Sequence, residues 1–172
     1  MSLNVQAICD ADLKIIDIVA RWPGSTHDNY IFNNSAVRMK FENGSMANLL
    51  LLGDSGYPVQ SYLMTPLGNP QSAAENLYNE SQIRTRNLIE RTFGVLKRRF
   101  PILSIGLRCR LPLAQQTITA AAILHNLAVL QGDDMPVDDM EYEDPLDVEP
   151  HQDQIGQNNI RRLIINYFGT LL

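Results

Sequence analysis

Four consecutive leucines, Leu49 to Leu52, run directly into Gly-Asp-Ser-Gly, and this stretch constrains the fold more than any other. An uninterrupted apolar run of this length predicts a strand buried on both faces. Such a strand needs a covering layer on each side, which favours an α/β fold. Ligands and metals gather at the carboxyl ends of strands in open α/β sheets. Asp54 is therefore a candidate metal ligand, with the start of a tight turn as the alternative.

The flanking sequence supplies further strands and helices. "SLNVQAICD" and "LKIIDIVARW" predict two strands, joined by a hairpin turn at Asp10-Ala11-Asp12. The stretch "PGSTHDNYIFNNSAVRMKF" predicts one helix, with Ser25 as its N-cap, Asp28 as the acidic member of a capping box, and Asn43-Gly44 at its end. "SYLMTPLG" predicts a further short strand.

Two longer helices follow. Residues 72–100 show helical periodicity that stops at Pro101, and a second pattern runs from Pro112 to Gly132. Residues 154–172 predict a closing helix or a docking segment. Strands on both sides of a helical crossover predict a mixed sheet with helices packed on its faces.

Charge is distributed unevenly along the 172 residues. Residues 133–153 carry ten acidic and no basic side chains, with three prolines, which is typical of a disordered linker. Residues 1–132 carry nine acidic and twelve basic side chains, a balance of +3, although the whole chain is at −5. We expect this basic body to attract a polyanion.

The apolar runs, the first residues and the cysteines bear on the cellular compartment of the protein. The apolar runs are shorter than the roughly 18 residues of a membrane span, so no membrane partner is expected. No secretory signal is recognised in residues 1–9. Cys9 and Cys109 have no CxxC or histidine companion, which favours a reduced compartment, the cytosol or the nucleus.

Glu90 is the second candidate metal ligand. It lies 100° from Ile89 on a helical wheel, at the border of the apolar stripe that would pack on the sheet. Carboxylates from two elements could hold Mg²⁺ ions that activate water for phosphodiester cleavage. The alternative is a surface ion pair between Glu90 and Arg86, one helical turn away.

Other polar residues have simpler interpretations. Asp28 fits a helix cap better than a ligand, and His27 beside it fits a helix-start residue better than a base. His125, in "AAILHNL", is predicted to be a hydrogen-bonded packing residue. Five basic side chains of the long helix could contact a phosphate backbone, or could form an ordinary solvated face: Arg86, Arg91, Lys97, Arg98 and Arg99.

The order of several motifs resembles a known family. "RWPGSTHDNYIF", "LLGDSGYP", "TPL", "RTRNLIERTFGVLKRRFPIL" and "AAAILHNL" together resemble the PIF/Harbinger-type transposases and the Harbinger transposase-derived nucleases, which belong to the DDE superfamily of endonucleases. The resemblance covers about residues 2 to 131 and rests on the ordered set rather than on one motif.

The resemblance implies a ribonuclease H-like α/β fold with an Asp-Asp-Glu triad that binds Mg²⁺ or Mn²⁺ and acts on DNA. Asp54 matches the second aspartate of the family and Glu90 its glutamate. Asp28 matches the acidic residue of the Gly-Ser-x-His-Asp motif and is a third candidate ligand. The resemblance also implies a nuclear location, with the cytoplasm as a further option, and a Myb-like protein partner.

In this family the first catalytic aspartate lies on a strand just upstream of the segment that matches "SLNVQAICD", so we expect this chain to lack that strand and to hydrolyse DNA weakly or not at all. The predicted organisation is a nuclease domain over 1–132, an acidic disordered linker over 133–153 and a C-terminal helix or docking segment over 154–172. The alternative function is a non-catalytic transposase-derived module that binds DNA or a protein. A phosphatase-like hydrolase is a more distant option.

Overall fold

The computed structural model describes residues 2–136 and 154–172, and these form two compact units. The first unit contains residues 2–35 and 88–136, and the second contains residues 36–87 and 154–172. The predicted linker over 133–153 lies outside the described residues from residue 137 onward.

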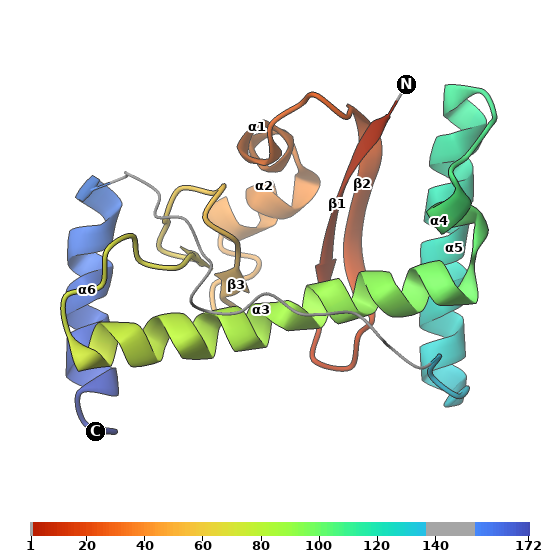
Figure 1. The fold of residues 1–172 in the computed structure, drawn as a ribbon. Coiled ribbons are helices and arrows are strands. Elements are labelled where there is room, and N and C mark those ends of the chain that lie inside the picture. Colours follow the sequence, from red (N-terminus) through yellow and green to blue (C-terminus); the bar gives the residue numbers. More distant parts are fainter. Residues whose placement is uncertain (1, 137–153) are drawn as a thin grey trace. The chain divides into compact units, whose positions relative to one another are not determined.

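The first unit is built on a β-hairpin. Strand β1 (Leu3–Cys9) pairs antiparallel with β2 (Ile15–Pro23), as predicted (Figure 1). The Asp10 carboxylate accepts hydrogen bonds from the backbone N–H groups of Asp12 (3.0 Å) and Lys14 (2.9 Å), which fixes the turn between the strands. The hairpin therefore forms from local sequence signals.

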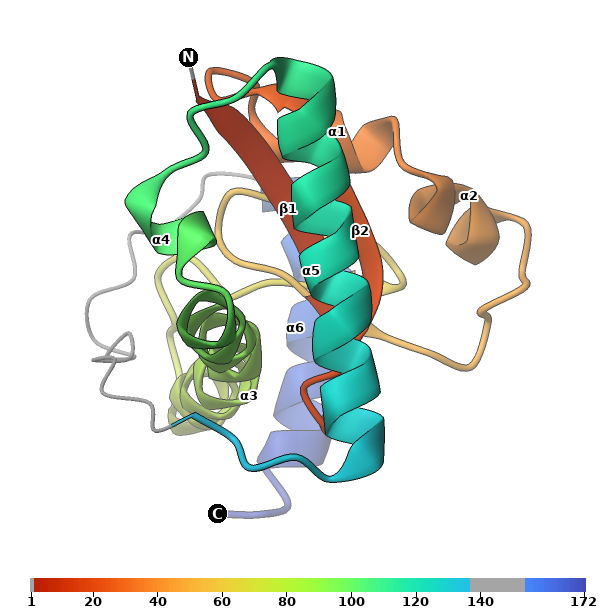
Figure 2. The same cartoon turned by 90° about the vertical axis from the view of Figure 1, so that its right-hand side faces the viewer.

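Helix α5 (Leu111–Gln131) lies across this hairpin (Figure 2). Pro112 stands in its first turn, and Gly132 ends it in the left-handed conformation, with φ at 71°. The core of the unit forms where the hairpin, α5 and the C-terminal turns of α3 (Ala73–Arg99) meet, and its buried members are Ile15, Leu96, Ala121 and Ala122. The short helices α1 (Asp28–Asn33) and α4 (Ile102–Ile105) complete the unit.

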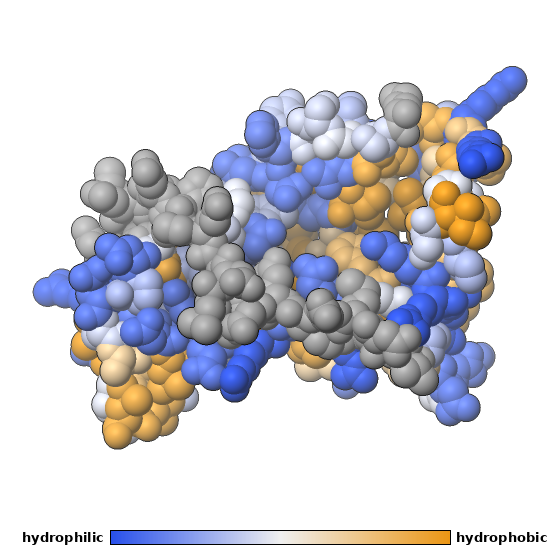
Figure 3. Space-filling view, in the orientation of Figure 1, coloured by the Kyte–Doolittle hydropathy of each residue, from blue (hydrophilic) through white to orange (hydrophobic). Residues whose placement is uncertain are grey.

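The second unit contains α2 (Ala36–Glu42), the strands β3 (Leu51–Leu52) and β4 (Leu63–Met64), the N-terminal half of α3 and α6 (Gln154–Phe168). The two strands are parallel and pair only with each other within the described ranges. Leu67, Tyr78 and Ile164 form a buried cluster. Apolar side chains also gather at the C-terminal end of α6 (Figure 3), where Leu171 and Leu172 are exposed.

Two expectations about the sheet were wrong. The described strands form two separate two-stranded sheets instead of one mixed sheet, because each strand pairs on one side only. The leucine run is not buried on both faces, since Leu49 and Leu50 are 57% and 62% exposed and precede the two-residue strand β3. The mixed α/β composition itself agrees with the prediction.

The single helix predicted after Pro23 was also wrong. Ser25 lies within a turn in which the Thr26 N–H donates to the Pro23 carbonyl at 2.9 Å, so the N-cap is His27 instead. The helix then breaks between α1 and α2, where the Ser35 hydroxyl donates to the Phe32 carbonyl (2.7 Å). Asparagine and serine compete in this way for backbone hydrogen bonds and disfavour helix interiors.

By length and composition, α5 is long and apolar enough to cross a membrane, which differs from the expectation drawn from its shorter apolar runs. The same length and composition also suit the core helix of a folded domain. In this structure α5 packs against β2 and contributes to the core of the first unit.

Candidate functional site

Asp54 follows directly after β3 and Gly53, and hydrogen bonds hold both the N–H and the carbonyl of Gly53. The Gly53 N–H donates to the Met64 carbonyl at 2.9 Å, and the Gly53 carbonyl accepts from the Gln82 side-chain amide of α3 at 2.8 Å. Gln82 is buried, and its amide also reaches the Met64 carbonyl at 3.3 Å. These contacts fix the backbone from which the Asp54 side chain extends.

The Asp54 carboxylate itself forms a local turn. Its Oδ1 accepts a hydrogen bond from the Gly56 N–H at 2.8 Å, so the predicted Asx-turn is present. The side chain is partly exposed, and it has no ion pair among residues 2–136 and 154–172. The turn uses one carboxylate oxygen and is compatible with a further role for the other.

Asp28 is fixed to the hairpin of the first unit. Its Oδ1 accepts a hydrogen bond from the Asn4 side-chain amide at 2.7 Å, and the same amide donates to the Thr26 carbonyl at 2.8 Å. Asn4 therefore ties the start of α1 to β1. The carboxylate that was predicted to cap the helix bonds to a neighbouring strand instead.

Glu90 lies on α3 and is partly buried. It has an interaction partner, as does Arg86, the residue that was expected to pair with it. Glu90 and Asp28 belong to the first unit and Asp54 to the second. The meeting of Asp54 and Glu90 around a cation stays a prediction.

The basic residues of α3 differ in exposure. Arg91, Lys97 and Arg98 are exposed, as a phosphate-binding surface requires. Arg86 is only 7% exposed, so it presents little surface to DNA and does not lie on a solvated face either. Arg99 approaches Asp133 at 3.5 Å and donates to the Asp134 carbonyl at 3.4 Å, so local groups already engage it.

His125 and Asn126 anchor the hairpin to α5. His125 is fully buried, and its Nε2 lies 2.8 Å from the Leu13 carbonyl oxygen, which confirms a hydrogen-bonded packing role. A carbonyl only accepts, so Nε2 carries the proton. Asn126 accepts from the Ile15 N–H and donates to the Ile15 carbonyl, both at 2.8 Å.

The sequence interpretation missed Asn4, Gln82 and Asn126, which hold these backbones in place. Gln82 lies one position before the buried Ile83, and Asn126 one position after the buried His125. An amide beside the apolar stripe of a helix is the one sequence signal that marks such residues, and it does not identify their partners.

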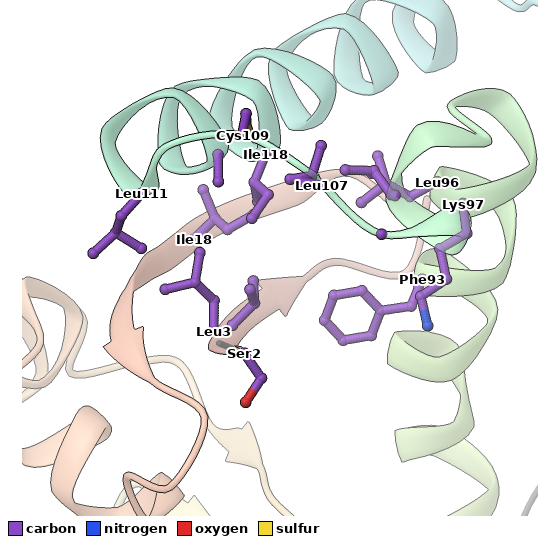
Figure 4. A pocket seen from close by; sticks show the side chains of 14 residues that line it. Ser2, Leu3, Ile18, Phe93, Leu96, Lys97, Leu107, Cys109, Leu111 and Ile118 are labelled. Atoms are coloured by element: carbon purple, nitrogen blue, oxygen red, sulfur yellow. The ribbon is translucent and has the colours of Figure 1, made fainter.

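A cavity of about 620 Å³ lies within the first unit. Figure 4 shows Phe93 and Leu96 of α3, Leu111 and Ile118 of α5, and Ile18 of β2 around it. Neither Asp28 nor Glu90 lines this cavity. It is a mainly apolar space that is separate from the predicted carboxylate site.

The two cysteines are free. Burial raises the pKa of the Cys9 thiol above its ordinary value, and a side-chain hydrogen bond with Thr92 opposes the shift. Cys109 is exposed. In the part of the chain that the structure describes, no group of three or more His, Cys, Asp or Glu side chains is arranged to hold a metal ion.

Comparison with known proteins identifies the class. A sequence profile of the family described as DDE superfamily endonuclease matches residues 1–126. The chain therefore belongs to the DDE superfamily endonuclease family, which confirms the resemblance seen in the motifs.

The individual relatives include "Putative nuclease HARBI1". The chain is 33% identical to the protein of that name from Mus musculus and 32% identical to the one from Homo sapiens, in each case over 98% of this chain and 51% of the relative. It is 28% identical to "Protein ALP1-like" from Arabidopsis thaliana, over 80% of this chain and 37% of that protein. The chain thus spans about half the length of the HARBI1 relatives. No solved structure gives a significant match.

Proposed function

We propose that this chain is a transposase-derived nuclease domain of ribonuclease H-like type that acts on DNA phosphodiester bonds. The family assignment and the nuclease names of its relatives support this proposal. The structural observation that carries it is the position of Asp54 directly after β3, on a backbone held by Met64 and Gln82. The carboxyl ends of strands are where α/β proteins place ligand-binding groups.

The proposed metal ligands are Asp54 and Glu90, with Asp28 as the third candidate. Carboxylate oxygens are the donors that Mg²⁺ and Mn²⁺ prefer, so the side chains suit a hard divalent cation. Such an ion, when bound, would activate water and stabilise the charge that develops on the phosphate oxygens. The hydrogen bond from Gly56 orients the Asp54 carboxylate, and the bond from Asn4 orients that of Asp28.

DNA is the proposed substrate, and the exposed Arg91, Lys97 and Arg98 are proposed to contact its backbone. A substrate of this kind implies a nuclear location, and a Myb-like protein is proposed as an accessory partner. Arg99 is proposed as a weaker contact, because Asp133 already approaches it. Arg86 is no longer proposed, because it is buried.

Metal binding should be tested first, by measuring Mn²⁺ uptake with electron paramagnetic resonance, which does not depend on catalysis. We expect weak binding that falls at least about tenfold in Asp54→Ala and Glu90→Ala. Asp12→Ala, in the hairpin turn, and Glu80→Ala, on the same helix as Glu90, are the matched controls and should bind as the wild type does. Equal binding by all five proteins would contradict the assigned ligands.

Activity is then measured as nicking of supercoiled plasmid in Mg²⁺ or Mn²⁺, with the same variants. Slow nicking that disappears in Asp54→Ala and Glu90→Ala, while both controls retain it, supports the nuclease. DNA binding without metal uptake or nicking would identify a non-catalytic module. Hydrolysis of a small phosphate ester with no action on DNA would identify a phosphatase-like enzyme.

A further inference from the structure

Helix α1 lies beside the end of the hairpin where β1 begins and β2 ends (Figure 1), and it carries an exposed aromatic side chain. Tyr30 is 53% exposed, and its ring meets that of Trp22 edge to face, with the centroids 5.2 Å apart and the planes at 86°. Aromatic pairs with this geometry are favourable. Trp22 therefore holds the Tyr30 ring in place while about half of the side chain stays open to solvent.

A cation is fixed beside the same two rings. The Arg21 guanidinium carbon lies 5.5 Å from the centroid of the Trp22 ring, and Nη2 of Arg21 donates to the Asn34 carbonyl at 2.9 Å. Arg21 is exposed and has no ion pair among residues 2–136 and 154–172. A guanidinium carries five N–H donors, so further donors stay available for a phosphate. Arg21, Trp22 and Tyr30 together are called the aromatic cluster below.

The aromatic cluster lies next to Asp28, the third candidate metal ligand. Asn4 and Trp22 are direct partners across the hairpin, so their side chains share one face of it. The Asn4 amide donates to the Asp28 carboxylate at 2.7 Å, and Trp22 packs against Tyr30. The carboxylate and the tyrosine ring thus rest on neighbouring side chains of one unit. A ligand on the Tyr30 ring would lie close to any ion that Asp28 holds.

An exposed aromatic ring with a cation beside it matches the chemistry of a nucleotide. A nucleobase stacks on an aromatic side chain, and its phosphate pairs with an arginine. The base faces are hidden inside a duplex, so a stacking ring selects a nucleotide that is unpaired. A proline-rich peptide also packs on aromatic rings, but it offers no anion to Arg21.

We infer that the aromatic cluster binds an unpaired nucleotide of single-stranded or locally opened DNA. The base stacks on Tyr30, which Trp22 supports, and the phosphate binds Arg21. This inference rests on the proposed function, because it names the form of DNA that the site accepts.

The test uses Trp22 as a reporter, because it is the only tryptophan of the chain. An oligothymidine of about 20 nucleotides is titrated into the full chain in EDTA, so that binding does not depend on a metal ion. We expect the single strand to quench the Trp22 fluorescence. Fluorescence anisotropy measures the dissociation constants for the labelled single strand and for a duplex of the same length.

The variants separate stacking from apolar packing. Tyr30→Leu keeps an apolar side chain but removes the ring, so we expect its affinity for the single strand to fall at least about fivefold, with little change for the duplex. Tyr30→Phe keeps the ring and should bind as the wild type does. Tyr167→Leu is the matched control, since Tyr167 is 65% exposed and meets Phe168 edge to face in the second unit. Circular dichroism verifies that each variant is folded.

Arg21→Ala tests the phosphate contact and should reduce the magnitude of the salt slope for the single strand by about one. Wild-type affinity in Tyr30→Leu, an equal loss for single strand and duplex, or an equal loss in Tyr167→Leu would overturn the site. Its fate is separate from that of the nuclease. A single-strand defect in Tyr30→Leu without plasmid nicking by the wild type would support the site and contradict the nuclease, and nicking with no such defect would do the reverse.

Discussion

Gly53 occupies a position where a side chain has very little space. A Cβ atom there would lie 3.0 Å from a ring carbon of Tyr57 and 3.1 Å from a methyl carbon of Leu63. The backbone cannot move aside easily, because its N–H and its carbonyl are both hydrogen-bonded. Close packing thus favours glycine before Asp54, because a larger residue would push these two side chains aside.

We expect Gly53→Ala to lower the free energy of unfolding by about 1–3 kcal/mol, because overpacking forces the neighbours to shift. Urea denaturation measures the change. Ser55→Ala, two residues away and outside these contacts, should cost less than about 0.5 kcal/mol. A Gly53→Ala protein as stable as the wild type would contradict the tight packing.

Cys9 and Cys109 should differ in reactivity towards iodoacetamide near pH 8. Burial raises the pKa of Cys9, so a smaller fraction is thiolate, and thiolate is the reacting form. Cys109 is exposed and should be alkylated several-fold faster. Mass spectrometry follows both sites, and unfolding in urea should abolish the difference. Faster modification of Cys9 in the native chain would contradict its burial.

At the scale of elements, α6 is held to the second unit by an ion pair. Glu75 is 2% exposed, and its Oε1 accepts from Arg161 of α6 at 2.9 Å. Its other oxygen accepts from the Gln71 N–H, and Arg161 also donates to the Gly68 carbonyl at 3.0 Å. Glu75 thus joins the start of α3 to the closing helix.

Glu75→Ala should lower the free energy of unfolding by about 3–5 kcal/mol, because it leaves Arg161 without its carboxylate in a partly buried site. Limited proteolysis should then cleave near α6 earlier than in the wild type. Glu80→Ala, which breaks an exposed pair with Arg84 on the same helix, should cost about 0.5 kcal/mol or less. Equal effects from the two variants would contradict a special role for Glu75.

The elements that the sequence predicted correctly have strong local signals. The long helix was expected over 72–100 and spans Ala73–Arg99, and Pro112 and Gly132 mark the ends of α5. The prediction of a buried strand over the leucine run was wrong. The hydrophobicity of a segment indicates a need for burial but does not supply strands on both sides of it. The break between α1 and α2 at Ser35 was not predicted, because it depends on a side-chain hydrogen bond that hydrophobic periodicity does not reveal.

The candidate site was predictable to a similar extent. The Asp54 turn follows from adjacent residues, and a packing role for His125 followed from its place among apolar residues. The amides that hold these backbones act across long separations: Gln82 reaches Gly53, and Asn126 reaches Ile15. Such pairings arise from tertiary packing and have no local sequence signature.

At the scale of the whole molecule, the exposed basic residues predict salt-dependent DNA binding. Each phosphate contact contributes about 0.9 to the slope of log affinity against log salt concentration. Arg91→Ala and Lys97→Ala should each reduce the magnitude of that slope by about one. Lys40→Ala, exposed on α2, is the matched control and should leave it unchanged. Fluorescence anisotropy with a labelled duplex provides the measurement, and an unchanged slope in all variants would exclude these contacts.

The pairing of Ile15 with Asn126 bears on the order of events during synthesis. The hairpin leaves the ribosome before the helix that covers it, which emerges more than a hundred residues later, after residues 36–87 of the second unit. Until then the apolar face of the nascent hairpin is open to water and to other chains. Translation speed and early chaperone contact should therefore influence the yield of folded protein more strongly here than in a domain whose hairpin is covered by adjacent sequence.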